Sequence, residues 1–215
     1  MRPRVRVKIC GVAAPEVARA AAAAGADAVG LVFAESRRRV TVAQAEQVAA
    51  ALPPFVAAVG VFVDAPVEEV LALAHGIPLD VVQLHGEEPP EEVAALRAQG
   101  LRVVKALRVG DRFDAKELER YRAATAVLLD TRTAGAAGGT GRSFDWVLAR
   151  GLSERMSVIL SGGLTPENVT EALEVVRPYA VDVSSGVETD GRKDPEKIHA
   201  FIEAVRRWEC RGEMR

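Results

Sequence analysis

The sequence predicts a (β/α)8 barrel, also called a TIM barrel, formed by residues 1–215 as a single domain. Short β-branched runs alternate with Ala-, Glu- and Arg-rich amphipathic segments, which is typical of βα units with a parallel sheet. Eight such pairs recur every 22–31 residues or so, and eight units in 215 residues suit a compact barrel. An open doubly wound sheet is the alternative, but it usually has fewer strands and often a glycine-rich first turn, which "CGVAAPE" is not.

The strands are expected in order at 5–10, 27–33, 56–63, 80–85, 102–107, 125–130, 157–162 and 179–185. Helical periodicity between them predicts helices near 15–24, 41–51, 66–75, 89–99, 114–122, 144–150, 166–176 and 195–208. Several helix starts carry capping residues or first-turn prolines, namely Thr41, Ser143, Thr165, Pro66, Pro166 and Asp194–Pro195.

The first strand alternates cations and a thiol with Val7 and Ile9. Period-2 alternation turns Lys8 and Cys10 to the barrel axis and the two apolar residues to the helices. The eighth strand neighbours the first once the barrel closes, and its Asp182 also faces the axis. Because an unpaired buried cation is costly, a Lys8–Asp182 pair is expected inside the barrel.

Charge and composition exclude several classes of partner. The formal net charge of −2 and the pI near 6.0 argue against nucleic acid or a membrane as the main partner. No apolar run has the length of a membrane span, and the N-terminus lacks the apolar region of a signal peptide, so a cytoplasmic protein is expected. Cys10 and Cys210 are expected to be free thiols, and no His or Cys spacing predicts a metal site.

Function in a barrel concentrates at the carboxyl ends of the strands. Cys10 ends the first strand, Gln83 and His85 the fourth, and Asp130 the sixth, while the arginines at 37–39 follow the second. These residues also have structural explanations. Cys10 could be a small buried side chain, His85 could simply form a structural hydrogen bond, Asp130 could cap a turn, and the arginines could lie on a solvent-exposed face. Guanidinium groups at this edge could instead bind a carboxylate or phosphate.

Glycine-rich loops follow the last two strands, "LSGGLTPENV" and "VDVSSGVE". Backbone N–H groups in such loops can approach a phosphate, and these two loops are the usual phosphate site of a barrel. They could also be merely tight turns, but together they favour phosphate. The residues alone therefore predict a barrel enzyme for a phosphorylated small molecule, with Cys10 and Asp130 as candidates for a base and an acid.

The ordered set of motifs resembles phosphoribosylanthranilate isomerase. It comprises "VKICG", "GLVF" followed by "SRR", "VGVFV", "VQLHGEE", "LLDT", "GGTGRSFDW", "LSGGLTPENV" and "VDVSSGVE", and "GRKDPEKIHAFI" follows. The resemblance covers nearly the whole chain. It implies a (β/α)8 barrel, an Amadori rearrangement in tryptophan biosynthesis and no metal or redox cofactor.

The resemblance also implies site residues. Cys10 would be the general base, and Asp130 would be the general acid. The base needs a lowered pKa, and a nearby cation is one way to lower it, although help from Lys8, one strand repeat away, would be indirect. Arg38 would hold the anthranilate carboxylate, although Ala34–Glu35 departs from the family pattern there and Arg37 or Arg39 could share the role. Gln83 and His85 are expected to contact the substrate. Backbone amides around Gly162, Gly163, Ser185 and Gly186 would bind the phosphate, and the loop at 135–141 matches a mobile loop of the family.

Other functions of a phosphate-binding barrel are alternatives to this assignment. A metal-type epimerase would want more His and Asp at strand ends, and the histidine-pathway aminoaldose isomerase would be expected to carry Asp in place of Cys10. A non-catalytic phosphate-binding barrel would not need Cys10 and Asp130 together. A homodimer is expected if residues 53–55, "PPF", remain exposed.

Overall fold

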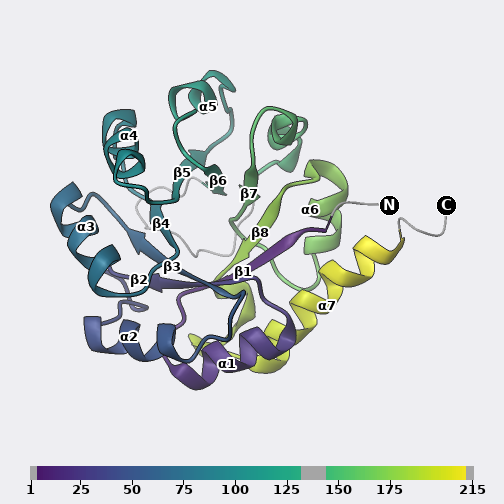
Figure 1. Cartoon of the computed structure of the whole chain (residues 1–215). Helices are drawn as coiled ribbons and strands as arrows, with labels where there is room; N and C mark the ends of the chain where they lie inside the picture. The colour runs from purple at the N-terminus through teal and green to yellow at the C-terminus, as the bar shows by residue number, and fades with distance from the viewer. Residues whose placement is uncertain (1–3, 132–143, 212–215) are drawn as a thin grey trace.

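The computed structural model describes residues 4–131 and 144–211, and it shows a closed barrel. Eight parallel strands pair in chain order and β8 returns to β1, so that the strands form the centre of a ring of helices (Figure 1). The strands are β1 (Arg6–Cys10), β2 (Ala28–Val32), β3 (Ala57–Phe62), β4 (Val81–Leu84), β5 (Val103–Val109), β6 (Ala126–Thr131), β7 (Val158–Leu160) and β8 (Ala180–Val183). The predicted (β/α)8 barrel is confirmed.

The helices that surround the barrel are α1 (Pro15–Ala24), α2 (Val42–Ala50), α3 (Val67–Gly76), α4 (Pro90–Ala98), α5 (Lys116–Arg120), α6 (Val169–Val176) and α7 (Pro195–Arg211). Two predicted helix starts are borne out by hydrogen bonds. The Thr41 side chain accepts from the Gln44 N–H at 3.2 Å while the Gln44 side chain accepts from the Thr41 N–H at 2.9 Å, which is a capping box. Asp194 Oδ1 accepts from the Glu196 N–H at 2.9 Å at the start of α7.

Three predicted helices differ from the structure in type or extent. The helix expected over 166–176 begins only at Val169, so Thr165 and Pro166 precede it. The segment 144–150 forms no α-helix but a 3-10 helix, η1 (Trp146–Ala149), followed by a second, η2 (Leu152–Glu154). Gly151, with φ 76°, separates them, because a left-handed residue cannot continue a right-handed helix. The helix expected over 114–122 shrinks to the five residues of α5. Ser143, the cap expected for the helix over 144–150, lies outside the described residues.

Apolar side chains pack in two layers, one between the strands and the helices and one inside the barrel. Val7 and Ile9 are fully buried in the outer layer, whereas Leu128 lies in the inner cluster. The alternation of β1 therefore runs as predicted. None of the helices in the described ranges is long and apolar enough to cross a membrane.

Lys8 and Asp182 are the charged pair that this alternation requires. They face each other in the register of β1 and β8, with Lys8 Nζ 2.9 Å from Asp182 Oδ1 and both side chains buried. Burial by itself lowers the pKa of Lys8, but Asp182 and then Cys10 outweigh it and raise that pKa above its ordinary value. The barrel interior thus holds a buried ion pair beneath Cys10.

A polar clasp joins the last helix to the first strand at the amino-terminal end of the barrel. Arg206 of α7 donates to the Val5 carbonyl at 2.8 Å, to the Gly25 carbonyl at 3.1 Å and to Asp27 Oδ2 at 3.2 Å. Asp27 Oδ2 also accepts from the Val7 N–H at 2.9 Å. One arginine therefore ties together α7, β1 and the turn before β2.

Replacing Arg206 with Met is expected to lower the free energy of unfolding by about 1–2 kcal/mol, since the variant leaves two carbonyls without their charged donor and removes one of the cations that pair with Asp27, which keeps Arg4 at 2.6 Å. Urea unfolding with an unchanged m-value measures this. Arg207→Met is the matched control, because Arg207 is exposed and its partner among the described residues is Glu203 one turn away. Equal loss in both variants would show that the clasp contributes nothing of its own.

Candidate active site

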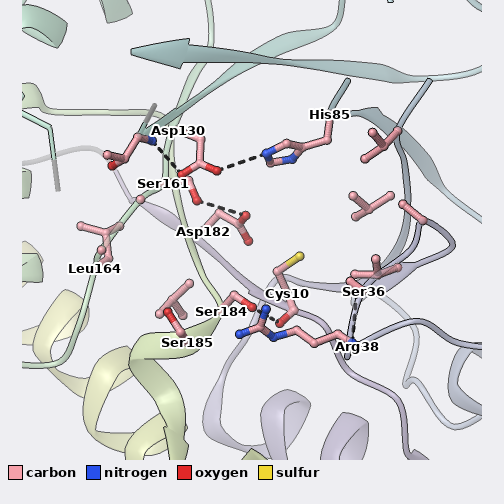
Figure 2. Close-up of a pocket in the computed structure, with 18 of the residues that line it drawn as sticks. Cys10, Ser36, Arg38, His85, Asp130, Ser161, Leu164, Asp182, Ser184 and Ser185 are labelled. Atoms are coloured by element: carbon pink, nitrogen blue, oxygen red, sulfur yellow. Dashed lines mark hydrogen bonds and ion pairs between the residues drawn. The ribbon is translucent and has the colours of Figure 1, made fainter. Parts of the chain in front are cut away.

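One pocket opens at the carboxyl ends of the strands (Figure 2). It brings together residues from strands far apart in the chain: Cys10, Val32, Ala34, Glu35, Ser36, Arg38, Val61, Val63, His85, Arg108, Asp130, Thr131, Ser161–Leu164 and Asp182–Ser185. Val32, Ala34, Val61 and Val63 form an apolar wall beside β2 and β3, whereas a thiol, three carboxylates, two arginines, a histidine and hydroxyls line the rest. Such a lining suits a ligand with an apolar ring and several polar groups.

Cys10 ends β1 with its sulfur facing the pocket (Figure 2). Its register partner on β2 is Gly30. A Cβ atom at Gly30 would lie 2.8 Å from Cys10 Sγ and 3.1 Å from Lys8 Cε, which is too close for a side chain. The absence of a side chain at Gly30 therefore leaves the space that the Cys10 and Lys8 side chains occupy. Sequence reasoning missed this role, because a glycine inside a strand signals close approach without naming the neighbour.

The electrostatics of Cys10 differ from expectation. Burial raises the pKa of the Cys10 thiol above its ordinary value, and Lys8 and Lys193 oppose this only in part while Asp182 adds to it. The expected net lowering of this pKa by a cation is therefore wrong for the ligand-free protein. The cations are present, but desolvation of the thiolate outweighs them.

Asp130 is the last residue but one of β6, across the pocket from Cys10, and belongs to a chain of three side chains. Its Oδ2 lies 3.1 Å from His85 Nε2, and His85 Nδ1 lies 2.8 Å from Gln83 Nε2. Its other oxygen, Oδ1, accepts from the Thr131 N–H at 2.8 Å. Both carboxyl oxygens are thus held, and one of them contacts a group that can exchange a proton.

The His85–Gln83 pair allows two arrangements of protons. If the Gln83 amide donates to Nδ1, the imidazole N–H points from Nε2 to an ionised Asp130. If the amide is turned so that Oε1 accepts from Nδ1, then Nε2 accepts from a protonated Asp130. The same geometry serves Asp130 with and without its proton, which is what an acid that later recovers its proton needs.

Arg38 lines the pocket on the side of Cys10 and is held from behind by Glu188. Its Nε donates to Glu188 Oε1 at 2.7 Å and its Nη2 to Oε2 at 3.0 Å, a two-point fork. A Cβ atom at Gly11 would clash with Arg38 Cδ, so a left-handed glycine with φ 78° lets the arginine lie across the backbone. Nη1 has no acceptor among the described residues.

Two glycine loops close the side of the pocket next to β7 and β8. Gly162 and Gly163 have φ of 86° and 68°, and a Cβ at Gly162 would clash with Thr131 Oγ1. Asn168 braces this loop by donating to the Gly163 carbonyl at 2.9 Å. For the N–H groups of Gly162, Gly163, Ser185 and Gly186, the described residues supply no hydrogen-bond acceptor. These loops can therefore offer free donors to an anion.

The family model of N-(5′-phosphoribosyl)anthranilate (PRA) isomerase matches residues 7–204. The chain belongs to this family. The N-(5′-phosphoribosyl)anthranilate isomerase of Moorella thermoacetica is 50% identical over 206 residues, which cover 95% of this chain and 91% of the relative. Membership makes the chain an isomerase of tryptophan biosynthesis.

Solved structures of the family superpose on the whole barrel. The phosphoribosyl anthranilate isomerase of Thermus thermophilus is 41% identical with a TM-score of 0.85 and covers 94% of this chain and 99% of its own. A second, in complex with reduced 1-(o-carboxyphenylamino)-1-deoxyribulose 5-phosphate, is 43% identical with a TM-score of 0.81 and covers 94% and 98%.

In this barrel, most residues singled out by the sequence line one pocket, and two do not. Gln83 is buried beneath His85 and contacts it instead of the cavity. Gly186 allows the loop after β8 to pack closely against the loop after β7, since a Cβ there would clash with the Leu164 carbonyl oxygen. The loop at 135–141 lies outside the described residues.

Two charged residues next to the pocket, Glu188 and Lys193, were not predicted from the sequence. Glu188 stands in the quoted "VDVSSGVE", and Lys193 follows an Asp-Gly dipeptide that signals a hairpin. Within 4–131 and 144–211, no three His, Cys, Asp or Glu side chains lie together as metal ligands.

Proposed function

We propose that the protein converts N-(5-phosphoribosyl)anthranilate to 1-(2-carboxyphenylamino)-1-deoxyribulose 5-phosphate by an Amadori rearrangement, with Asp130 as general acid and Cys10 as general base. The observation that carries the proposal is the placement of these two groups on one pocket, from β1 and β6, between an arginine and two loops with free N–H groups. Both groups of the reaction can thus reach a single small ligand.

Asp130 begins the reaction by opening the furanose ring. Its protonated carboxyl gives its proton to the ring oxygen, and the C1–O bond breaks while the anilinic nitrogen forms a Schiff base at C1. His85, 3.1 Å from Oδ2, supports the protonated carboxyl in the arrangement in which its Nε2 accepts.

Cys10 then acts on C2. The positive charge of the Schiff base acidifies the C2–H bond, and the thiolate takes that proton, so that the C–H electrons form the C1–C2 double bond of an enolamine. The enolamine takes a proton at C1 and loses one from the C2 hydroxyl, which leaves the ketone.

Arg38 is proposed to bind the anthranilate carboxylate through its Nη1 edge. Of the three arginines at 37–39 only Arg38 lines the pocket. Arg37 is more than half exposed and bonds Glu188 from outside, and Arg39 pairs with the exposed Glu35.

The phosphate is proposed to lie on the two glycine loops, where the N–H groups of Gly162, Gly163, Ser185 and Gly186 find no protein acceptor in the described part of the chain. The relative in complex with a reduced deoxyribulose phosphate supports a ligand of this class. The apolar wall at Val32, Val61 and Val63 then faces the benzene ring.

The test follows N-(5-phosphoribosyl)anthranilate by its anthranilate fluorescence, which falls as the substrate is consumed. The wild-type protein is expected to turn it over and to leave the histidine-pathway aminoaldose unchanged. A protein that binds inorganic phosphate but consumes neither substrate would overturn the enzymatic proposal in favour of a phosphate-binding barrel.

A homodimer is proposed through Phe55, which precedes β3. This ring is fully exposed, and its backbone takes φ 76°, a conformation that a bulky residue seldom adopts. An apolar side chain held out in this way suits insertion into a second copy. A solved relative, 42% identical, is a monomeric form generated from the dimeric phosphoribosylanthranilate isomerase of Thermotoga maritima.

Replacing Phe55 with Asn is expected to shift the protein from dimer to monomer in analytical ultracentrifugation, because it removes the ring while it tolerates positive φ. Val147→Asn, at another exposed apolar residue on η1, is the control and is expected to leave the mass unchanged. A wild-type protein that sediments as a monomer at all concentrations would contradict the proposal.

A further inference from the structure

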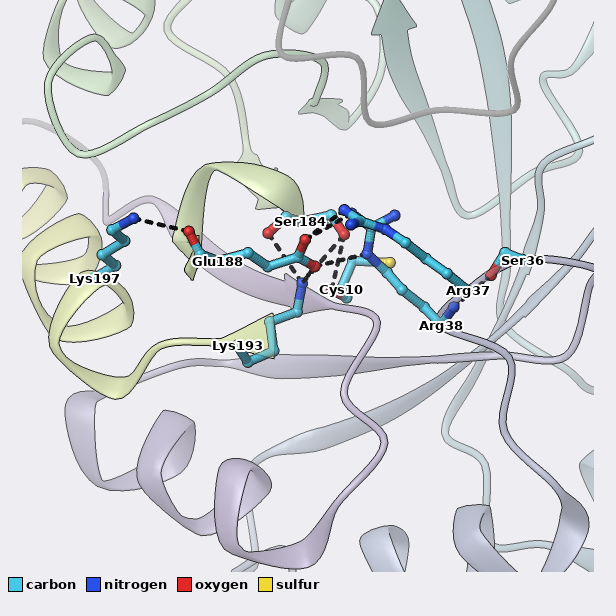
Figure 3. A network of polar contacts seen from close by, with 8 residues as sticks. All are labelled: Cys10, Ser36, Arg37, Arg38, Ser184, Glu188, Lys193 and Lys197. Atoms are coloured by element: carbon cyan, nitrogen blue, oxygen red, sulfur yellow. Dashed lines mark hydrogen bonds and ion pairs between the residues drawn. The ribbon is translucent and has the colours of Figure 1, made fainter. Parts of the chain in front are cut away.

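A buried carboxylate beside the pocket gathers three cations (Figure 3). Glu188 Oε1 accepts from Arg38 Nε at 2.7 Å and from Lys193 Nζ at 2.6 Å, while Oε2 accepts from Arg37 Nη2 at 2.6 Å. Only 5% of the Glu188 side chain is exposed. The cluster contains one negative charge and three positive charges. Its net charge is therefore positive, because Glu188 cannot neutralise all three cations.

The cluster is assembled by a hairpin outside the barrel. The strands β9 (Glu188–Thr189) and β10 (Arg192–Lys193) pair antiparallel, with Lys193 directly opposite Glu188. Asp190 and Gly191 between them have φ of 51° and 76°, the pattern typical of a type I′ turn. A two-residue turn of this kind fixes the register, so Lys193 reaches its position without a flexible connection.

Lys193 points from this hairpin toward Cys10 (Figure 3). Its Nζ donates to the Ser184 carbonyl at 3.0 Å and contacts the Ser184 hydroxyl at 3.3 Å, and that hydroxyl donates to the Cys10 carbonyl at 3.1 Å. The Lys193 side chain is 5% exposed. Its ammonium is therefore held next to the backbone of Cys10 in a site shielded from water, where a charge acts over a longer range than in solvent.

Two other charged groups face the thiol, and they oppose each other. Lys8 favours the thiolate, but Asp182, its partner at 2.9 Å, disfavours it. Lys193 also favours the thiolate, and its partner Glu188 forms ion pairs with Arg37 and Arg38 as well. Lys193 is therefore the cation whose effect at Cys10 is least offset by its own partner.

We propose that Lys193 is a positioning residue that holds a positive charge beside Cys10 and so eases formation of the thiolate. Glu188 keeps Lys193 in place, and because it also holds Arg38, it links the proposed base to the proposed carboxylate site. The catalytic consequence of this inference rests on the proposed role of Cys10 as base. The electrostatic effect of Lys193 does not, because the charge state of the thiol can be measured without turnover.

The experiment measures the rate of alkylation of Cys10 by iodoacetamide as a function of pH in a Cys210→Ser background, where Cys10 is the only thiol. Lys193→Met is expected to shift the titration to higher pH by about 0.5–1 unit, which lowers the rate at a fixed pH below the midpoint by about 3–10-fold. Lys193→Arg is expected to restore the parent curve.

Lys197→Met is the matched control. Lys197 belongs to the same network, but it donates to the Glu188 carbonyl at 2.8 Å and points away from Cys10 (Figure 3). An unchanged curve is expected for this variant. A Lys193→Met curve that coincides with the parent overturns the inference, and so does an equal shift in the Lys197 control.

The same measurement separates the inference from the proposed function. If Cys10→Ala keeps full activity while Lys193→Met still shifts the thiol titration, the role of Cys10 as base fails and the electrostatic role of Lys193 stands. If Cys10→Ala is inactive and the titration does not move, only the inference fails.

Discussion

Asp130→Asn is expected to lower kcat by about 10²–10⁴-fold with little change in KM, since the amide keeps the shape of the acid but has no proton to give to the ring oxygen. The fold should tolerate the change. The oxygen of the new amide can accept from the Thr131 N–H as Asp130 Oδ1 does now at 2.8 Å, and the amide NH₂ can donate to His85 Nε2. The rate of loss of substrate fluorescence measures the effect.

Asp145→Asn is the control for that variant. Asp145 is exposed and caps η1 by accepting from the Val147 N–H at 3.0 Å, and Asn serves equally well as a cap. This variant is expected to match the wild type in kcat. Turnover by Asp130→Asn at the wild-type rate would show that ring opening does not depend on this acid.

The sequence predicted the barrel because the features that build it are local and periodic. Each strand of the barrel overlaps its predicted range. The inward row of β1 and the Lys8–Asp182 pair followed from period 2 and from the closing of β8 on β1, and both are confirmed. Alternation and topology together decide which residues meet inside a closed barrel.

The segment 144–150 shows where local pattern misled. Its seven residues have helical periodicity, but a stretch that short does not form a helix without support, and Gly151 with φ 76° ends it. Two short 3-10 helices result. Propensity over so few residues is a weak prior that the chain around it overrides.

At the site, the strand-end rule placed Cys10, His85, Arg38 and Asp130 on one pocket, but it could not place what lies behind them. The Glu188–Lys193 pair depends on a hairpin that follows β8, and the Gly30 gap depends on register. The pKa of Cys10 depends on burial, which outweighs its cations and which no spacing of residues reveals.

Cys10→Ala is expected to lower kcat by about 10²–10⁴-fold as well, because it removes the group proposed to take the C2 proton. Cys10→Asp should recover part of the activity, since a carboxylate can act as base from the same end of β1. Both variants lack the sulfur, but only Cys10→Asp carries a group that can accept a proton, so recovered activity in that variant is assigned to proton transfer.

The pH dependence distinguishes the thiol from the carboxylate. Only the thiolate is a base, and burial raises the pKa of Cys10, so in the wild type kcat/KM should still rise with pH through and above the ordinary thiol range. In Cys10→Asp that ascending limb should move to lower pH, because a carboxyl ionises well below a thiol. If the limb stays in place in Cys10→Asp, it belongs to another group, and Cys10 cannot be the base.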